Sequence, residues 1–205
     1  MRDFIAHLFP RIVLGRNLRI TYTFCLGGLA FSAFMALGVS GILLLFYYQP
    51  TPEKAFQSIL FLESSVWAGR EIRSVHRMAS HFFLVFVFLH MLRVILTGAY
   101  RKPRELNWVI GFGLLLLTVF SAYSGYLLPM DQLAYWATQT GMELLRILPF
   151  GEFFRGLLVP DGVGESLSLL RFYVLHVAII PAVVFILTGW HFYRVRTEKG
   201  LLPYL

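Results

Sequence analysis

Three long stretches of the chain carry no charged side chain, and this feature constrains the fold more than any other. Residues 20–52, 106–130 and 172–193 contain no Asp, Glu, Lys or Arg. A helix needs about 20 apolar residues to cross the hydrocarbon core of a bilayer, and helices and closed barrels are the only structures that satisfy their backbone hydrogen bonds there. Each stretch is therefore predicted to hold one membrane-spanning helix.

A fourth span is predicted between the first two of these stretches, with Arg77 and Arg93 bracketing its apolar centre. The composition agrees with a membrane protein, because only 14% of the residues are charged, whereas about 25% is usual in soluble domains. We expect a single all-α membrane domain over residues 1–205, built as a four-helix bundle. The spans are expected at about residues 23–48, 74–99, 107–128 and 172–193.

Positive charge is distributed unevenly. The N-terminal segment, the loop between the second and third spans with its adjoining helix end, and the C-terminal tail hold eleven Lys/Arg and three acids, whereas the other connections hold seven and eight. Because Lys and Arg collect on the cytoplasmic side, we expect both termini there, on the n side. The net charge of +7 then reflects topology and not nucleic-acid binding. Residues 1–15 are expected to form a surface helix, not a secretory signal.

Four histidines lie inside the predicted spans, His76 and His90 in the second and His176 and His191 in the fourth. Spacings of 14 and 15 residues put each pair roughly on one helix face, about 21–22 Å apart in depth. The two spans run parallel, so His76 is level with His176 near the outer, p side, and His90 with His191 near the n side. Two imidazoles that face each other across a bundle can ligate a six-coordinate haem, so the pattern predicts two haems stacked across the membrane.

Glycines repeat this interval in the other two spans. Gly27 and Gly41 are 14 residues apart in the first span, as are Gly111 and Gly125 in the third. Glycine is common in membrane helices because it lets them pack closely. The repeated interval favours a further role, since a helix without a side chain at that point can approach a flat porphyrin. We expect these four glycines to contact the haems.

Arginines lie close to the predicted ligands. Arg73 and Arg77 flank His76, and Arg93 follows His90 by three residues. An ionisable residue within a span is a candidate functional residue, and Arg pairs well with carboxylates such as the haem propionates. Snorkelling of the arginines to lipid head groups is the competing interpretation.

These motifs resemble the cytochrome b family of quinol–cytochrome c and plastoquinol–plastocyanin oxidoreductases, and most closely its split short form, cytochrome b6. The resemblance spans roughly residues 15–200 and implies axial ligation by His76 with His176 and by His90 with His191. It is carried by RSVHR (73–77), LHMLRV (89–94), KPRELNWV (102–109), SGYLLPMDQ (124–132) and RFYVLH (171–176) followed by Pro181.

The resemblance also gives a role to the single cysteine. Cys25 lies in FCLGG (24–28), which is similar to the segment where one thioether holds an additional c-type haem in cytochrome b6. It implies that haem c is covalently attached at Cys25, with Gly28 and Arg196 at positions that line it. The residue types alone would make Cys25 a small buried apolar side chain, because the chain has no C-x-x-C-H motif.

Two departures from the family pattern concern quinol. Met130 stands where the family usually has Trp beside the p-side quinol pocket. The sequence also lacks the Pro-Glu-Trp-Tyr segment that completes this pocket, which in split systems lies on a subunit-IV-like membrane subunit. The other partners that the resemblance implies are quinol and quinone, a Rieske iron–sulfur protein, cytochrome c subunits and a second copy of the whole complex. The setting would be a bacterial inner membrane or a thylakoid-type membrane.

The resulting hypothesis is an electron-transfer subunit of a quinol:cytochrome c or plastocyanin-type oxidoreductase, inactive alone and without catalytic residues of its own. Electrons would cross the membrane between p-side and n-side quinone sites through two haems b, aided by the haem at Cys25. Two other hypotheses stay open. One is a di-haem membrane anchor of a quinone-linked dehydrogenase or hydrogenase, whose ligands need not fall two per helix. The other is a haem-free scaffold or transporter subunit.

Overall fold

The computed structural model describes residues 24–197, and in this part of the chain every regular element is a helix. Four helical segments are long and apolar enough to cross a membrane, as the sequence predicted. They are α3 (Leu26–Leu45), α5 (Gly69–Leu96), α6 (Glu105–Leu127) and a continuous segment of α9 (Ser166–Val174), η2 (Leu175–Ile179) and α10 (Ile180–Thr197). The expected all-α, four-span architecture is confirmed, while the surface helix expected over residues 1–15 lies outside the described residues.

Two of the helical segments extend beyond the spans expected from the sequence. α5 begins at Gly69 and not near residue 74, and the fourth segment runs from Ser166 to Thr197 and not from 172 to 193. The expected boundaries followed the charged residues, but a charge does not end a helix. Long side chains at the ends of a span can reach the head-group region while the backbone stays helical.

The connections between spans are also largely helical. The connection over residues 131–170 contains α7 (Gln132–Arg146) and α8 (Gly151–Leu158), and α4 (Ala55–Ser65) lies between the first two spans. The start of α7 has a local cause, because the carboxylate of Asp131 accepts a hydrogen bond from the backbone N–H of Ala134 at 2.8 Å. An Asp at this position satisfies an N–H group that the helix itself cannot.

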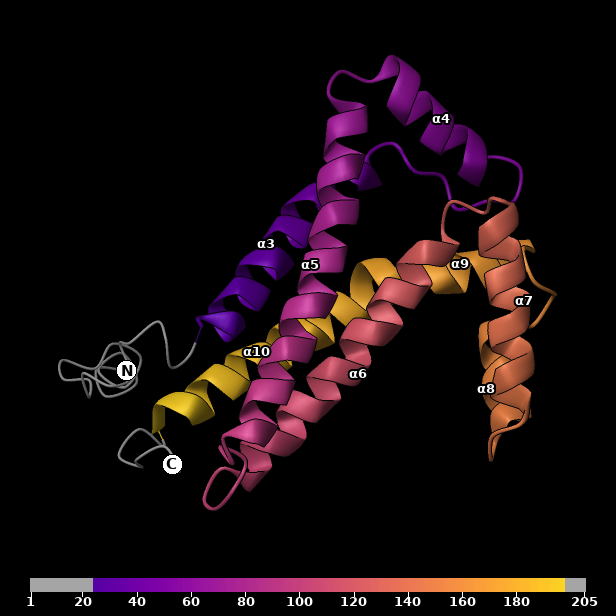
Figure 1. Cartoon of the computed structure of the whole chain (residues 1–205). Helices are drawn as coiled ribbons and strands as arrows, with labels where there is room; N and C mark the ends of the chain where they lie inside the picture. The colour runs from indigo at the N-terminus through magenta and orange to yellow at the C-terminus, as the bar shows by residue number, and fades with distance from the viewer. Residues whose placement is uncertain (1–23, 198–205) are drawn as a thin grey trace.

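Figure 1 shows the four spans as one bundle, with α4 across one end and the α7–α8 pair beside it. α3 packs along α5, α5 touches α6, and α6 packs along α10. Aromatic rings join α3 to α10 and to α5. The ring centres of Phe31 and Phe192 are 5.2 Å apart, and those of Phe34 and Phe83 are 5.7 Å apart.

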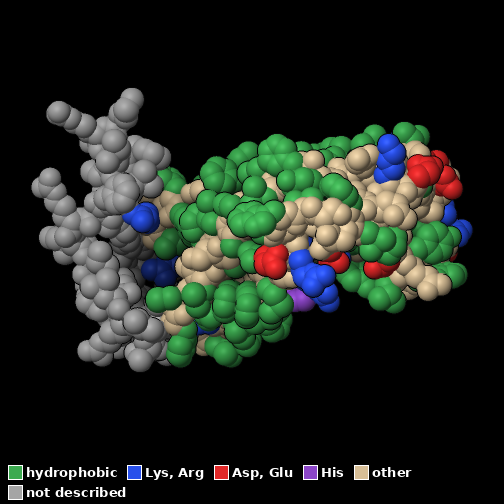
Figure 2. Space-filling model, turned by 90° about the horizontal axis from the view of Figure 1, so that it is seen from above, with side chains coloured by type: hydrophobic (Ala, Val, Ile, Leu, Met, Phe, Trp, Pro, Cys, Tyr) green, Lys and Arg blue, Asp and Glu red, His purple; other side chains and the backbone are tan. Residues whose placement is uncertain are grey.

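Large apolar side chains cover much of the surface of the spans, as Figure 2 shows in green. Examples are Val39 on α3 and Ile186 on α10, with 61% and 68% of their surfaces exposed. Such a surface would favour aggregation in water, but lipid tails are as apolar as these side chains. The surface therefore fits a bundle surrounded by lipid.

The main buried cluster lies at the end of the bundle where α7, α8 and α9 meet α6. It contains Leu127, Met142, Val159 and Phe172. Beside it, the hydroxyl of Tyr48 donates a hydrogen bond to the carbonyl of Leu128 at 2.6 Å. Burial, reinforced by the nearby Tyr173, raises the pKa of Tyr48, so this hydroxyl keeps its proton and remains a donor. The contact joins the chain after α3 to the end of α6.

Candidate functional site

The structure brings the four intramembrane histidines together as two pairs. The ring centres of His76 on α5 and His176 in η2 are 6.3 Å apart, with ring planes at 76°. Those of His90 on α5 and His191 on α10 are 6.4 Å apart, with ring planes at 83°. Both pairs join the second span to the fourth, as the sequence predicted.

The separation within each pair fits a shared metal ion. Two opposed imidazoles with metal–nitrogen bonds of about 2.0 Å place their ring centres roughly 6 Å apart. Each pair offers two nitrogen ligands, which leaves the other positions around an iron for the four nitrogens of a porphyrin. The spacing is thus suited to a six-coordinate haem at each pair.

Each histidine faces one glycine of a neighbouring span. A methyl group added at Gly27 would lie 3.4 Å from the His90 ring, one at Gly41 would lie 3.3 Å from His76, and one at Gly111 would lie 3.4 Å from His191. One at Gly125 would overlap the ring of His176. The four glycines with the 14-residue interval are therefore the four that line the histidine pairs. Gly28, in contrast, has open space at its Cβ position.

Two serines that the sequence interpretation missed contact the first pair. Ser40 Oγ lies 2.9 Å from Nδ1 of His76, and Ser124 Oγ lies 3.2 Å from Nδ1 of His176. The carbonyl of Ser121 also lies 3.0 Å from this Nδ1. A signal existed in the sequence, since both serines directly precede a glycine of the 14-residue pattern.

The arginines are placed differently from one another. Arg73 forms an ion pair with Glu63 of α4, so it already has one carboxylate partner. Arg77 is exposed, whereas Arg93 is half-buried and close enough to His90 to interact with it electrostatically. Arg196 lies half-buried near the end of α10.

Cys25 lies at the start of the first span. It is exposed and directly precedes α3, with φ at 51° in the left-handed region. Two residues later, Gly27 faces His90. Cys25 is thus only two residues away from the glycine that contacts the His90–His191 pair.

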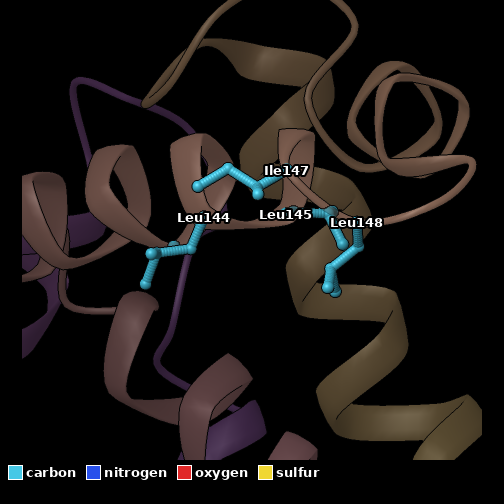
Figure 3. Close-up of a pocket in the computed structure, with 5 residues that line it drawn as sticks. Leu144, Leu145, Ile147 and Leu148 are labelled. Carbon is cyan, nitrogen blue, oxygen red and sulfur yellow. The ribbon is translucent and has the colours of Figure 1, made fainter.

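A surface hollow lies at the end of α7, and none of the four paired histidines lines it. It has a volume of about 450 Å³ and an apolar lining. Figure 3 shows the leucine and isoleucine side chains around it. Met130, where the family usually has Trp, lies just before α7 with φ at 47°, and its Cε approaches the backbone at Gly164.

The sequence and the fold are similar to those of known proteins. The family model described as "Cytochrome b(N-terminal)/b6/petB" matches residues 81–204. The chain is 44% identical to cytochrome b6 of Heliobacterium modesticaldum, over 96% of this chain and 90% of that protein. It is 46% identical to cytochrome b6 of Heliomicrobium gestii, over 85% and 83% of the two chains.

A cytochrome b subunit of a menaquinol:cytochrome c reductase is also similar. The chain is 36% identical to the menaquinol:cytochrome c reductase cytochrome b subunit of Bacillus subtilis, over 96% of this chain and 89% of that one. A solved structure titled "Hyperthermophilic respiratory Complex III" superposes with a TM-score of 0.80 at 29% identity, over 99% of this chain but 56% of that one. With four apolar spans and a matching family model, the chain is an integral membrane protein that belongs to the cytochrome b/b6 family, whose members bind haem b.

Proposed function

We propose that this chain is the di-haem electron-transfer subunit of a quinol-oxidising complex of the bc or b6f type. Its family membership supports the coarser role of a cytochrome b subunit in a quinol–cytochrome c oxidoreductase. The observation that carries the finer proposal is the pairing of four histidines at ring separations of 6.3 and 6.4 Å, each facing a glycine. A di-haem dehydrogenase anchor is less well supported, because the relatives are cytochromes b6 and cytochrome b subunits.

In this proposal His76 and His176 hold one haem b, and His90 and His191 hold the other. Bound there, two haems supply one-electron redox centres at two depths of the membrane. The protein itself aligns the imidazoles, leaves space at the glycines and keeps water away with apolar spans. Arg77 and Arg93 are assigned to the haem propionates.

Arg73 has a shared role in this proposal. Its guanidinium carries several N–H donors, so it can bind a propionate while it stays paired with Glu63.

Haem quantification tests the proposal directly. We expect the purified complex to contain two non-covalent haems b for each copy of this chain, both low-spin, because each pair supplies two axial nitrogens. A pyridine haemochrome assay combined with protein quantification measures the ratio. One haem b per chain, or none, would contradict the ligand assignment.

Gly125→Ala is expected to remove the haem at His76 and His176, or to reduce its occupancy at least several-fold. The added methyl group would overlap the His176 ring, which has to move out of its position. Gly113→Ala on the same helix is the matched control, because its Cβ position is open. Reduced-minus-oxidised spectra of the two variants measure the loss, and equal spectra would argue against a close approach at Gly125.

The quinol-binding role requires further subunits. We assign quinol oxidation to the end of the bundle formed by α7, α8 and the end of α6, next to the His76–His176 pair. The proposed partners are quinol and quinone, a subunit-IV-like membrane subunit, a Rieske iron–sulfur protein or cytochrome c subunits, and a second copy of the complex. This chain spans 56% of the length of the matched complex-III chain.

The topology is open to a simple test. We expect both termini on the cytoplasmic side, since eleven of the 18 Lys and Arg residues lie in the segments assigned there. A C-terminal fusion to a reporter that is active only in the cytoplasm should be active, and one that is active only outside should be inactive. The reverse pattern would overturn the assignment of sides.

A further inference from the structure

The two histidine pairs differ in the polar groups around them. Ser40 and Ser124 are buried, with 4% and 0% of their surfaces exposed, and their hydroxyls lie against His76 and His176. Among residues 24–197, no side-chain hydroxyl forms a hydrogen bond with either histidine of the other pair. Each hydroxyl also donates to a carbonyl of its own helix, which offsets the cost of burying it. The contact with the histidine is therefore an additional one.

The sequence also distinguishes the two histidine pairs, by the residue that precedes each facing glycine. Gly41 and Gly125, which face His76 and His176, are each preceded by a serine. The two glycines that face the other pair follow Leu26 and Ile110 instead. In the first pair this position supplies a hydroxyl to the ring, and in the second pair its residue types have no polar side-chain group.

At His76 the direction of the hydrogen bond is defined by the serine. The hydroxyl of Ser40 donates its proton to the carbonyl of Ala36, at 2.6 Å. Its oxygen is then free to accept, and Nδ1 of His76 lies 2.9 Å away. His76 therefore donates from Nδ1–H, and its Nε2 carries the lone pair. The carbonyl of Leu37 also lies near this ring.

At His176 the arrangement has the same sense. Nδ1–H donates to the carbonyl of Ser121 at 3.0 Å, with Ser124 Oγ at 3.2 Å. The Ser124 hydroxyl itself donates to the Ser121 carbonyl at 3.0 Å. Both histidines of this pair are thus held in the tautomer whose Nε2 is available to a metal, by oxygens on α3 and α6.

We propose that Ser40 and Ser124 are positioning residues that fix the ring orientation and tautomer of His76 and His176 and lower the reduction potential of the haem held there. The inference rests on the proposed di-haem function. A partner that accepts the second ring N–H orients a metal-bound histidine and increases its basicity. A more basic axial ligand favours ferric over ferrous iron, so this haem holds its electron less tightly than it would without the serines.

The experiment is a redox titration of the purified complex carrying Ser40→Ala. At the wild-type midpoint potential of the His76–His176 haem, the ratio of ferrous to ferric iron is expected to rise about threefold. This corresponds to an increase of about 28 mV in the midpoint potential, because a tenfold change in the ratio is 59 mV for one electron. The haem at His90 and His191 should keep its midpoint, which makes it an internal control. Ser124→Ala should shift the same haem in the same direction but less, because the Ser121 carbonyl remains as an acceptor.

Two control variants separate hydrogen bonding from packing. Ser40→Thr keeps the hydroxyl and should restore the wild-type midpoint. Thr118→Val removes another buried hydroxyl of α6 that bonds only to the carbonyl of Leu114 of its own helix, and it should shift neither haem. Electron paramagnetic resonance adds a second readout, since the low-spin signal of the His76–His176 haem should change in Ser40→Ala and not in Thr118→Val.

The outcomes are distinct. An unchanged midpoint in Ser40→Ala with both haems retained, or a shift equal to that of Thr118→Val, would overturn the inference. Loss of the haem in Ser40→Ala with retention in Ser40→Thr would support positioning by the hydroxyl, and loss in both variants would argue for packing alone and against the inference. If the wild-type complex lacks a haem ligated by two histidines, the proposed function itself fails.

Discussion

The complex with His176→Ala is expected to hold one haem b per chain and to lose quinol oxidation. His176 is one of two proposed axial ligands, and its ring centre lies 6.3 Å from that of His76. Alanine leaves an apolar gap that cannot bind iron, whereas the His90–His191 pair is untouched. Reduced-minus-oxidised spectra and pyridine haemochrome quantification should show that half of the haem b is lost. Turnover should fall at least a hundredfold, because electrons no longer cross the membrane.

His81→Ala is the matched control for this loss. His81 lies on α5, five residues after His76, but it is exposed and pairs with no other histidine among residues 24–197. Its replacement should leave both haems and the turnover unchanged within a factor of about two. Retention of two haems b in His176→Ala would contradict the ligand pairing, and equal loss in His81→Ala would mean that the assay reports assembly instead of ligation.

The position of His176 depends on a helical irregularity that sequence periodicity did not predict. The interval from His176 to His191 is 15 residues, against 14 in α5. In regular helices these intervals rotate a side chain by about +60° and −40°, so the two spans would not present their histidines alike. The structure contains a π-helical turn at Leu175–Ile179. Such a turn accommodates one extra residue within a helix, so the 15-residue interval acts as a 14-residue one.

The helix propensities of the residues did not predict this turn, because a π-bulge depends on the packing of the neighbouring helices. The four spans were predictable from hydropathy, and the pairing of histidines followed from their intervals. The glycines were predictable for a related reason. A helix that approaches two histidine rings needs a glycine at each ring, so its glycines have the same spacing as the histidines. Each serine precedes a glycine of the repeated interval, but the hydrogen bonds of Ser40 and Ser124 depend on their side-chain rotamers, which the sequence does not give.

The two short helices within residues 131–170 could not be predicted for another reason. Glycine does not mark helix ends consistently here, because Gly141 and Gly156 lie inside α7 and α8. Gly151 begins α8, and Asp131 caps α7. Arg146 at the end of α7 forms an ion pair with Glu152 of α8, and a second one with Glu143 within α7. Exposed pairs of this kind contribute little stability individually, so sequence alone could not show that they bring α7 and α8 together.

The expected covalent haem depends on Cys25 and on the space next to it. Cys25 precedes α3 as an exposed residue, and two residues later Gly27 faces His90. The Cβ position of Gly28 is open. A thioether forms where a thiol meets a haem vinyl group, so a haem c attached here would lie beside the haem proposed at His90 and His191. The assignment rests on the resemblance of FCLGG (24–28) to the haem c segment of cytochrome b6.

Cys25→Ser is therefore expected to abolish covalent haem completely while both haems b remain. A thioether survives denaturation, whereas axial ligation does not, so a denaturing gel stained for haem peroxidase activity should show a wild-type band near the 23.6 kDa of the chain. The variant should give no band, and its mass should equal that of the bare polypeptide. Gly28→Val should weaken the band without removing the thiol, because its side chain would occupy the open space at this position. An unstained wild-type band whose mass is also that of the bare polypeptide would refute attachment at Cys25 and leave a protein with two haems b.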